Sequence, residues 1–317
     1  MRLNPKQRIL SQPTMERLAV WIGHHSPRCR LTTSLCYHAG EAAYLNAPGQ
    51  AKRNAVLRDG GMMEVTLDEH AFREIYYFGT YEREVTAVIK HIAKPGQKWL
   101  DVGANIGYYT ILLSGLVGPD GEVHAFEPNP VMMNHLERSL LHNQACNVFL
   151  NRSAVSNVSG AEVILYVPVS SDSQSGQASL VVHKNIAETQ EVLVPTITLD
   201  DYLAKTSCRI DFMKIDIEGL EILAFQGMKK TFARQPPRMI FAEVSHLPDC
   251  LATPSELISL LIQAGYCPYR IRKQGIFAYD EDYLLDGGLD FNFLFVLPEA
   301  TPLIYSLIQQ EDALHGH

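Results

Sequence analysis

The stretch KWLDVGANIGYYT, residues 98–110, decides the fold of this chain because it joins a short apolar run to a turn that contains two glycines. Gly103 and Gly107 remove side chains at the point where a strand gives way to a helix. We expect the strand to end at Val102 and the helix to begin near Ile106. A backbone without side chains can approach a ligand closely, and the N-terminus of the following helix offers N–H donors. The stretch therefore predicts a ligand-binding turn at the carboxyl end of a strand.

Short apolar runs alternate with segments of helical period on both sides of this turn, which is the pattern of a doubly wound α/β sheet. The expected strands are KWLDVG, EVHAFE, NVFLN, DFMKID, RMIFAEV, YCPYRI and NFLFVL. Amphipathic segments at residues 131–142, 220–233 and 255–264 predict helices between them. The last two expected strands have no helix between them, so they could pair antiparallel.

Composition limits the classes of protein to which the chain can belong. With 317 residues, of which 46% are hydrophobic, it can bury one main core plus an appendage. We expect a soluble cytoplasmic protein, because the N-terminus lacks the apolar core of a secretory signal and no later run approaches the ~18 residues that span a membrane. Six scattered cysteines without a C-x-x-C pair suit a reducing compartment. The net charge of -8 argues against nucleic acid as a partner.

The second expected strand delivers an acid to the same edge of the sheet. Glu127 follows it in AFEPNP, and a carboxylate at this position can hold two ribose hydroxyls with its two oxygens. A dinucleotide turn more usually reads G-x-G-x-x-G, whereas this turn reads D-x-G-x-x-x-G with Asn105 inside it. The difference favours a ligand with an amino-acid end. Together the two motifs predict a nucleoside site.

Four stretches carry a resemblance to the S-adenosylmethionine-dependent methyltransferases and, within them, to the FkbM-type family. They are FGTYEREV at residues 78–85, LDVGANIGYYT at 100–110, AFEPNP at 125–130 and MKIDIEGLE at 213–221. The last, with its Lys-Ile-Asp-Ile-Glu-Gly-x-Glu pattern, is the most specific. The resemblance implies a seven-stranded, doubly wound, Rossmann-like class I methyltransferase sheet whose last strand is antiparallel.

The resemblance and the composition together predict a division of the chain into three parts. Residues 75–298 are expected to form the methyltransferase domain, preceded by an N-terminal extension at 1–74 and followed by a tail at 299–317. The extension looks like a cap or a dimerisation element, through which the chain could form a homo-oligomer. Residues 168–187 are rich in Ser, Gln and Gly, which is typical of a mobile loop, and we interpret them as a lid over the acceptor.

The resemblance also implies S-adenosyl-L-methionine as the methyl donor and assigns residues to it. The implied cofactor contacts are Glu82, Asp101, Gly103, Asn105, Gly107, Glu127, Ser153 and Ala154. The glycine turn would surround the methionine part, Glu127 would hold the ribose, and Ser153 and Ala154 would lie beside the adenine. Glu82 would approach the cationic amino group of the donor, with a helix cap or a surface ion pair as its alternative role.

Methyl transfer from a sulfonium is an in-line displacement, so positioning should dominate and a general base should add to it. The candidates at the carboxyl ends of the fourth and fifth strands are Asp216, Glu218, Glu243 and His246. The histidine has the best intrinsic pKa for a base, about 6.5, although it could instead be a loop residue bonded to the backbone. Asp216 and Glu243 could also hold magnesium. A metal is not favoured, because a hard dication wants more oxygen ligands than this pair offers.

Several functions remain open at this point. The leading expectation is O-methylation of a hydroxyl on a natural product, sugar or glycolipid. The alternative is N-methylation of a peptide or amide nitrogen, for which the loop at 168–187 and the N-terminal extension could grasp a longer chain. The acceptor is thus a small molecule, a glycan or a peptide. A non-catalytic nucleoside-binding module is a third reading, and a nicotinamide oxidoreductase is disfavoured because the turn lacks the second glycine of that fingerprint.

Overall fold

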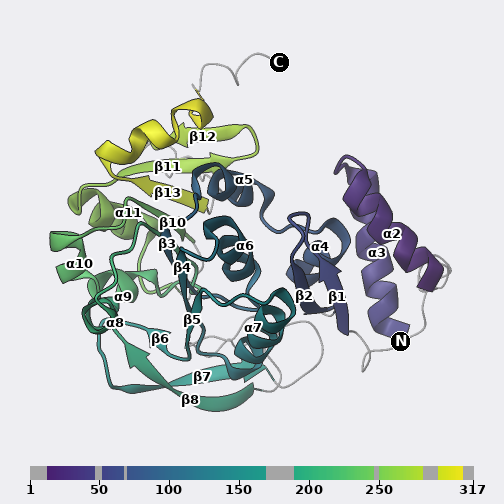
Figure 1. Cartoon of the computed structure of the whole chain (residues 1–317), viewed down its shortest axis with the longest axis horizontal. Coiled ribbons are helices and arrows are strands. Elements are labelled where there is room, and N and C mark those ends of the chain that lie inside the picture. Colours follow the sequence, from purple (N-terminus) through teal and green to yellow (C-terminus); the bar gives the residue numbers. More distant parts are fainter. Residues whose placement is uncertain are drawn as a thin grey trace.

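The computed structural model describes residues 13–46, 52–67, 70–168, 189–245, 250–280 and 292–309, and its main body is built on one eight-stranded sheet (Figure 1). The strands of this sheet are β3 (Lys98–Val102), β4 (Glu122–Phe126), β5 (Val148–Asn151), β9 (Phe212–Ile215), β10 (Met239–Glu243), β11 (Cys267–Arg272), β12 (Gly275–Ala278) and β13 (Asn292–Val296). Their spatial order is β12-β11-β13-β10-β9-β3-β4-β5. All seven expected strands are present.

The pairing of the strands confirms the doubly wound sheet and corrects its size. From β5 to β10 all neighbours are parallel, and β13 lies antiparallel between β10 and β11. The last two expected strands therefore do pair antiparallel. The expectation of seven strands was wrong by one, because β12 pairs antiparallel with β11 at the edge. Its apolar run is only IFA, between Gly275 and Tyr279 in a segment that is otherwise rich in polar residues, and it is too short to stand out in the sequence.

The central strands are mostly apolar because both faces of the sheet are covered, and Asp101 and Lys214 are buried polar exceptions within them. Trp99 and Leu100 are both fully buried, but they belong to the two different core clusters on opposite faces. The same alternation holds on β9, where Phe212 and Met213 face opposite clusters. Successive side chains of a strand point to opposite faces, so a strand between two helical layers shows no polar alternation.

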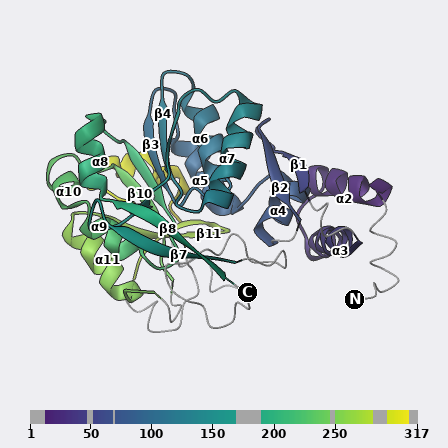
Figure 2. The same cartoon turned by 90° about the horizontal axis from the view of Figure 1, so that it is seen from below.

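Helices cover both faces of the sheet (Figures 1 and 2). One layer consists of α5 (Arg83–Ile92), α6 (Tyr108–Val117) and α7 (Pro130–Asn143), and the other of α8 (Leu199–Thr206), α9 (Glu221–Gln226), α10 (Lys229–Arg234) and α11 (Pro254–Gln263). The helices expected at 131–142 and 255–264 are confirmed. The one expected at 220–233 is two helices, broken at Gly227, where a Cβ would lie 2.3 Å from the carbonyl oxygen of Ser156.

The region before the sheet forms a separate layer of small elements. It contains α2 (Pro13–His25), α3 (Arg30–Asn46), β1 (Lys52–Val56), β2 (Met62–Thr66) and α4 (His70–Phe78). Helices α2 and α3 pack on α4, which packs on the β1–β2 hairpin, and β2 contacts α7 (Figures 1 and 2). Asn143 of α7 ties the hairpin to the main body, since its Oδ1 accepts from the Met62 N–H at 2.8 Å. The boundary expected after residue 74 falls inside α4.

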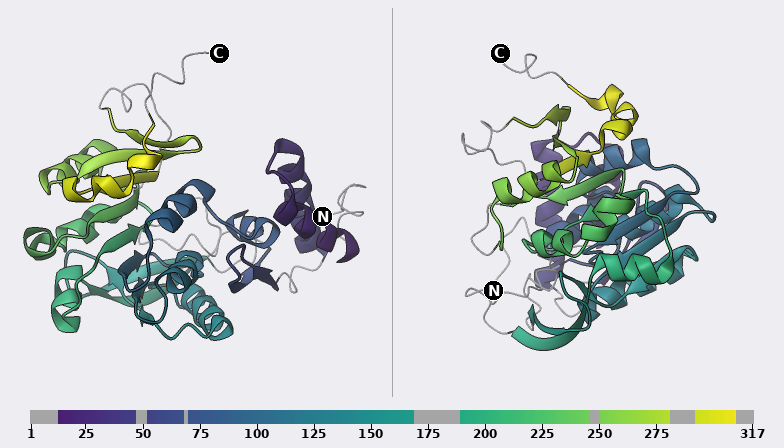
Figure 3. Two further views of the ribbon diagram at one scale, coloured as in Figure 1. Left: turned by 45° about the horizontal axis from the view of Figure 1, so that its top comes forward. Right: turned by 90° about the vertical axis from the view of Figure 1, so that its left-hand side faces the viewer.

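A second sheet, of three strands, lies beside the main one. It consists of β6 (Ala154–Val155), β7 (Glu162–Pro168) and β8 (Thr189–Ile197), in the order β6-β8-β7 (Figure 3). Of the expected lid at 168–187, only Pro168, the last residue of β7, lies within the described residues. After β13 the chain forms two short 3-10 helices, η2 (Pro298–Leu303) and η3 (Tyr305–Leu307). Among the helices that the structure describes, none has both the length and the apolar composition that a bilayer span requires.

Candidate active site

A cleft of about 760 Å³, partly open to solvent, lies at the carboxyl ends of β3, β4 and β9. Parallel strands bring the turns that follow them to one edge of the sheet, which is where ligands bind in doubly wound folds. The cleft brings together Gly103, Asn105, Glu127, Ser153 and Ala154 of the expected cofactor contacts with Asp216 and Glu218 of the expected catalytic residues. Residues separated by more than a hundred positions in the sequence thus share one surface.

Glu127 presents a fixed carboxylate to this cleft. Its Oε2 accepts a hydrogen bond from the Asn105 N–H and its Oε1 accepts one from the Asn129 N–H, both at 2.8 Å. Burial raises the pKa of Glu127 to about 7, although these two N–H groups act in the opposite direction. Each carboxylate oxygen has a second lone pair, so both can accept a further hydrogen bond from a ligand hydroxyl.

The glycine turn serves the protein's own packing as much as any ligand. Gly103 has φ 80°, and a Cβ there would lie 1.8 Å from the carbonyl oxygen of Asp216. Gly107 has φ 94°, and a Cβ there would lie 2.2 Å from the Leu136 side chain. Packing therefore requires both glycines, and their contact with a ligand stays a prediction. Gly107 leaves room for a core leucine, and Gly103 lets the turn after β3 touch the turn after β9.

A smaller cavity adjoins the cleft and is lined in part with ionisable side chains. Glu82, Lys214, Asp216 and Glu243 contribute to it, and Asp216 lines the cleft as well. Lys214 is buried, with its Nζ 3.1 Å from Asp216 Oδ2 and 5.1 Å from the centre of the Tyr109 ring. Burial works against its charge, but the surrounding carboxylates more than offset this and raise the pKa of Lys214.

The acids of this cavity differ in protonation. Burial and the neighbouring charge of Asp216 raise the pKa of Glu243 to about 9, and the Glu243 carboxyl donates a hydrogen bond to Asp216. Burial opposes ionisation of Asp216 as well, but Lys214 and this hydrogen bond lower its pKa. Glu218 sits at the exposed rim, where reduced hydration and the charges of Asp216 and Glu221 raise its pKa to about 7. The site thus combines an ionised acid, a protonated acid and one that titrates near neutrality.

Glu82 lies beside the smaller cavity, with its backbone in the left-handed region at φ 37°. Its Oε2 accepts from the Tyr109 hydroxyl at 2.8 Å and its Oε1 accepts from the Asn292 amide at 3.1 Å. Burial first, and the charge of Asp216 second, raise the pKa of Glu82. The structure therefore places Glu82 among the acids of the smaller cavity, together with Asp216 and Glu243. Its contact with a donor stays a prediction.

Asp101 lies within the sheet, directly before the turn. It is fully buried, its Oδ2 accepts from the Thr110 hydroxyl at 2.5 Å, and it is paired in register with Lys214 on the neighbouring strand. Within the described ranges its Oδ1 has no hydrogen-bond partner. Burial raises the pKa of Asp101, although the Lys214 ammonium opposes the shift. Buried carboxylate oxygens normally have a hydrogen-bond partner, so one that lacks a partner calls for an explanation.

Some residues of the site were not expected. Asn129 fixes Glu127 and also caps α7, and the Asn-Pro pair that opens a helix was a usable signal for it. Leu165 of β7 lines the cleft, but the composition of the segment gave no sign of that contact. Glu221, the first residue of α9, accepts from the Ile217 N–H at 2.9 Å and so holds the turn that carries Glu218. His246 lies outside the described residues.

Three comparisons with known proteins bear on this site. The family profile described as "Methyltransferase FkbM domain" matches residues 101–268, more than half of the chain. A search of curated proteins found no match. Among solved structures, an FkbM methyltransferase from Methylobacillus flagellatus KT is 16% identical, with a TM-score of 0.41 over 92% of this chain and 58% of that one.

Two further solved structures illustrate the range of similar proteins. The O-methyltransferase TomG from Streptomyces achromogenes is 12% identical, with a TM-score of 0.40 over 68% of this chain and 78% of that one. A putative rRNA-methylase from Clostridium thermocellum is 14% identical, with a TM-score of 0.38 over 67% of this chain and 94% of that one. The match to the family profile is the finding that assigns the chain: it belongs to the FkbM methyltransferase family.

Proposed function

We propose that this methyltransferase transfers the methyl group of S-adenosyl-L-methionine to a hydroxyl oxygen of a natural product, a sugar or a glycolipid. The observation that carries the proposal is the position of Asp216, which lines both the cleft with Glu127 and the acid-lined cavity with Glu243. A donor bound beside Glu127 and an acceptor that enters the same cleft beside Glu218 would meet next to this residue. Such a meeting point is what an in-line displacement needs.

The donor side suits a molecule with a ribose and a cationic amino-acid end. Glu127 accepts from the ribose hydroxyls, Gly103 and Asn105 lie along the methionine part, and Ser153 and Ala154 flank the adenine. Asp101 comes directly before this turn but is fully buried and is not among the described residues that line the cleft, so its contact with the donor stays a prediction. When bound, the donor supplies a methyl group that its sulfonium has already activated.

The acceptor side suits a hydroxyl that loses its proton as the new bond forms. Glu218 has a pKa of about 7 and lines the cleft, so it is the described residue best matched to accept that proton at neutral pH. Asp216, ionised beside Lys214, orients the hydroxyl as a hydrogen-bond acceptor. Glu243 stays protonated and keeps a second negative charge out of the cavity. His246 remains the other candidate for the base.

Charge in the cavity argues against a magnesium-dependent reaction. A magnesium site at Asp216 and Glu243 would need both carboxylates ionised and further oxygen ligands. Instead, the Lys214 ammonium already lies 3.1 Å from Asp216 Oδ2. The cation that balances Asp216 is therefore part of the chain.

The test is an acceptor screen with methyl-labelled S-adenosylmethionine and separate pools of glycans, hydroxylated small molecules and peptides. We expect label in a pool that carries hydroxyl groups, and the label should be lost with Glu218→Gln while Glu137→Gln, at an exposed ion pair, retains it. Label on a peptide nitrogen would replace O-methylation with the N-methyltransferase alternative. Calorimetry should show binding of S-adenosylhomocysteine and none of NAD, and the opposite result would overturn the proposal at the donor side.

We propose the same division of the chain as the sequence suggests, with a methyltransferase domain at 75–298, a cap or dimerisation element at 1–74 and a tail at 299–317. Exposed Trp21 and Leu31, 58% and 79% accessible, support a role of the N-terminal helices in self-association. Size-exclusion chromatography with light scattering would test it. All six cysteines lie within the described residues and none of them forms a disulfide, which supports a cytoplasmic location.

A further inference from the structure

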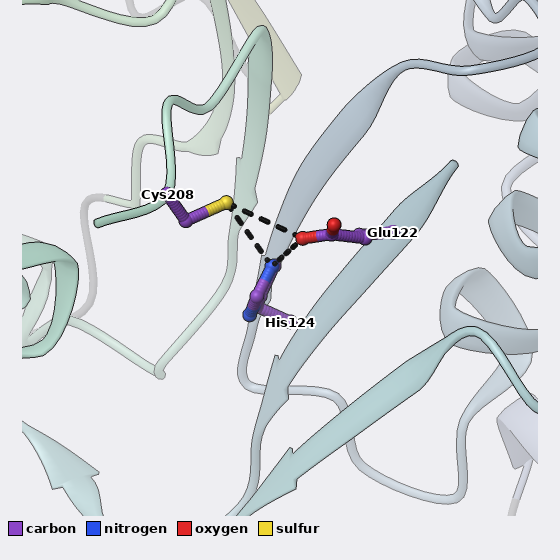
Figure 4. A group of neighbouring side chains, drawn as sticks. All are labelled: Glu122, His124 and Cys208. Carbon is purple, nitrogen blue, oxygen red and sulfur yellow. Dashed lines mark hydrogen bonds and ion pairs between the residues drawn. The ribbon is translucent and has the colours of Figure 1, made fainter. Parts of the chain in front are cut away.

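Three side chains of metal-ligand type meet at the amino ends of β4 and β9, at the opposite edge of the sheet from the cleft (Figure 4). Glu122 and His124 belong to β4, and Cys208 lies between α8 and β9. His124 Nε2 is 3.1 Å from Glu122 Oε2 and 3.3 Å from Cys208 Sγ, and Sγ is 3.5 Å from that same oxygen. The methyl-transfer proposal uses none of these residues.

We propose that Glu122, His124 and Cys208 bind one zinc ion, or a late transition-metal dication of similar chemistry, with water as the fourth ligand. Zinc bonds of ~2.0–2.2 Å to nitrogen and oxygen and ~2.3 Å to sulfur, in tetrahedral geometry, place ligand atoms roughly 3.3–3.7 Å apart. The observed separations run from 3.1 to 3.5 Å. The three atoms thus outline one face of such a tetrahedron, and a shift of a few tenths of an ångström would seat the ion.

The chemistry of the donor set selects the kind of ion. A thiolate and a carboxylate supply two negative charges and the imidazole is neutral, so the set balances a dication. Sulfur and nitrogen ligands favour zinc over magnesium or calcium, which prefer oxygen. Lys98 occupies the other carboxylate oxygen of Glu122, with its Nζ 2.6 Å from Oε1, and leaves Oε2 facing His124 and Cys208.

Neighbouring groups hold the histidine in place. His124 is almost fully buried, its Nδ1 lies 2.7 Å from the Tyr202 hydroxyl, and its ring stacks on Phe149 with 4.8 Å between centroids. When Nδ1–H donates to Tyr202, the Nε2 lone pair points toward the other two ligands, which is the usual support of a metal-bound imidazole. Glu122 and Cys208 are partly exposed, so an ion and its water can enter from solvent.

The alternative is a hydrogen-bonded cluster that needs no ion. In that case the Cys208 thiol and the His124 N–H would both donate to Glu122. Added divalent cations would then not displace these protons and would not bind. The two readings differ in one measurable property, because only a metal site binds one equivalent of zinc through Cys208.

The decisive experiment uses the untagged full chain and titrates zinc and cobalt in competition with a chromophoric chelator. We expect one tight equivalent, a cobalt spectrum with thiolate-to-metal charge transfer, and a zinc-dependent rise in the unfolding temperature. Cys208→Ser should weaken zinc binding more than about 100-fold, since loss of a ligand exceeds the effect of losing a supporting residue. Cys146→Ser, at an exposed free cysteine, should bind like the wild type.

Two results would overturn the proposal: no tight equivalent in the wild type, or an equivalent that Cys208→Ser retains. If Cys208→Ser fails to fold by circular dichroism, Glu122→Gln provides the same test at a partly exposed position. Each readout is independent of methyl transfer, so failure of the acceptor screen would leave the zinc proposal standing. Failure of the zinc titration would likewise leave the methyl-transfer proposal standing.

Discussion

Strand β4 has a glutamate at each end, and the pKa values of the two glutamates are shifted in opposite directions. Glu122, at its start, is partly exposed, and although burial opposes ionisation, hydrogen bonds from Lys98 and its neighbours lower its pKa. Glu127, just past its end, is buried, and its pKa rises to about 7. Position in the sheet, rather than residue type, therefore decides which glutamate is a permanent anion and which one titrates near neutrality.

The lysines of the two ends differ in the same way. Lys98 pairs with Glu122 at 2.6 Å where both side chains are about one-third accessible, at 34% and 29%. Lys214 is buried among Asp101, Asp216 and Glu82. A fold optimised only for stability would place an apolar residue at such a position. The carboxyl edge therefore retains charges that stability alone does not require, and such perturbed groups cluster at functional sites.

The largest expected effect is on turnover. Glu218→Gln should lower methyl transfer roughly 10²–10⁴-fold, because the amide cannot accept the acceptor's proton. The wild-type rate should rise with pH through about 7 as Glu218 loses its proton, and the variant should lose this rise. Rates measured across this range with a saturating donor would show both effects.

The matched control lies at the other end of the sheet. Glu122→Gln, which removes an ionised acid outside the cleft, should change turnover less than about threefold. Equal losses in the two variants would break the comparison between the two edges. A preserved pH profile in Glu218→Gln would transfer the role of base to His246.

The second effect is on stability and compares the two lysines. Lys214→Met should lower the free energy of unfolding by about 3–5 kcal/mol, since it leaves buried carboxylates without their cation. Lys98→Met should cost about 0–1 kcal/mol, as for a partly exposed ion pair. Urea unfolding of both variants at one pH would measure the difference. Similar losses would mean that burial does not separate the two ends.

The third effect is on donor binding. Glu127→Gln should weaken S-adenosylhomocysteine binding by about 1–3 kcal/mol, because the ribose hydroxyls lose a charged acceptor. Only the ionised form of Glu127 offers that charge and its pKa is about 7, so wild-type affinity should increase as pH rises through that value. The variant should show a flatter profile. Calorimetry at several pH values would test this, and an affinity unchanged by the substitution would move the ribose contact elsewhere.

Much of the fold could be predicted from the sequence because the central strands are buried on both faces and therefore read as short, predominantly apolar runs. The three-stranded sheet was not, since its long strands β7 and β8 are separated by the Ser- and Gln-rich segment and pair only in space. Strand β12 was missed because a three-residue apolar run in a polar segment carries little signal. Tertiary pairing, not local pattern, creates these elements.

The sequence predicted those residues of the site that come directly after a strand. Glu127, Asp216 and Glu218 were expected at this edge because each comes directly after a strand. The placement of Glu82 depends on Asn292, 210 residues away, and the environment of Gly107 depends on Leu136, so neither could be derived locally. The contact of His124 with Cys208 joins residues 84 positions apart, which is why the cysteines looked scattered.

The smallest expected effect on turnover comes from chelation, and it separates the two edges most directly. EDTA should change methyl transfer less than about twofold, because Lys214 rather than a dication balances Asp216. The same treatment should lower the unfolding temperature if Cys208 and its neighbours hold zinc. Inhibition that magnesium reverses would place a metal at Asp216 and Glu243 and overturn the metal-free reaction. Inhibition that zinc alone reverses would instead mean that the amino edge supports catalysis through the sheet, since the strands that begin at the one site end at the other.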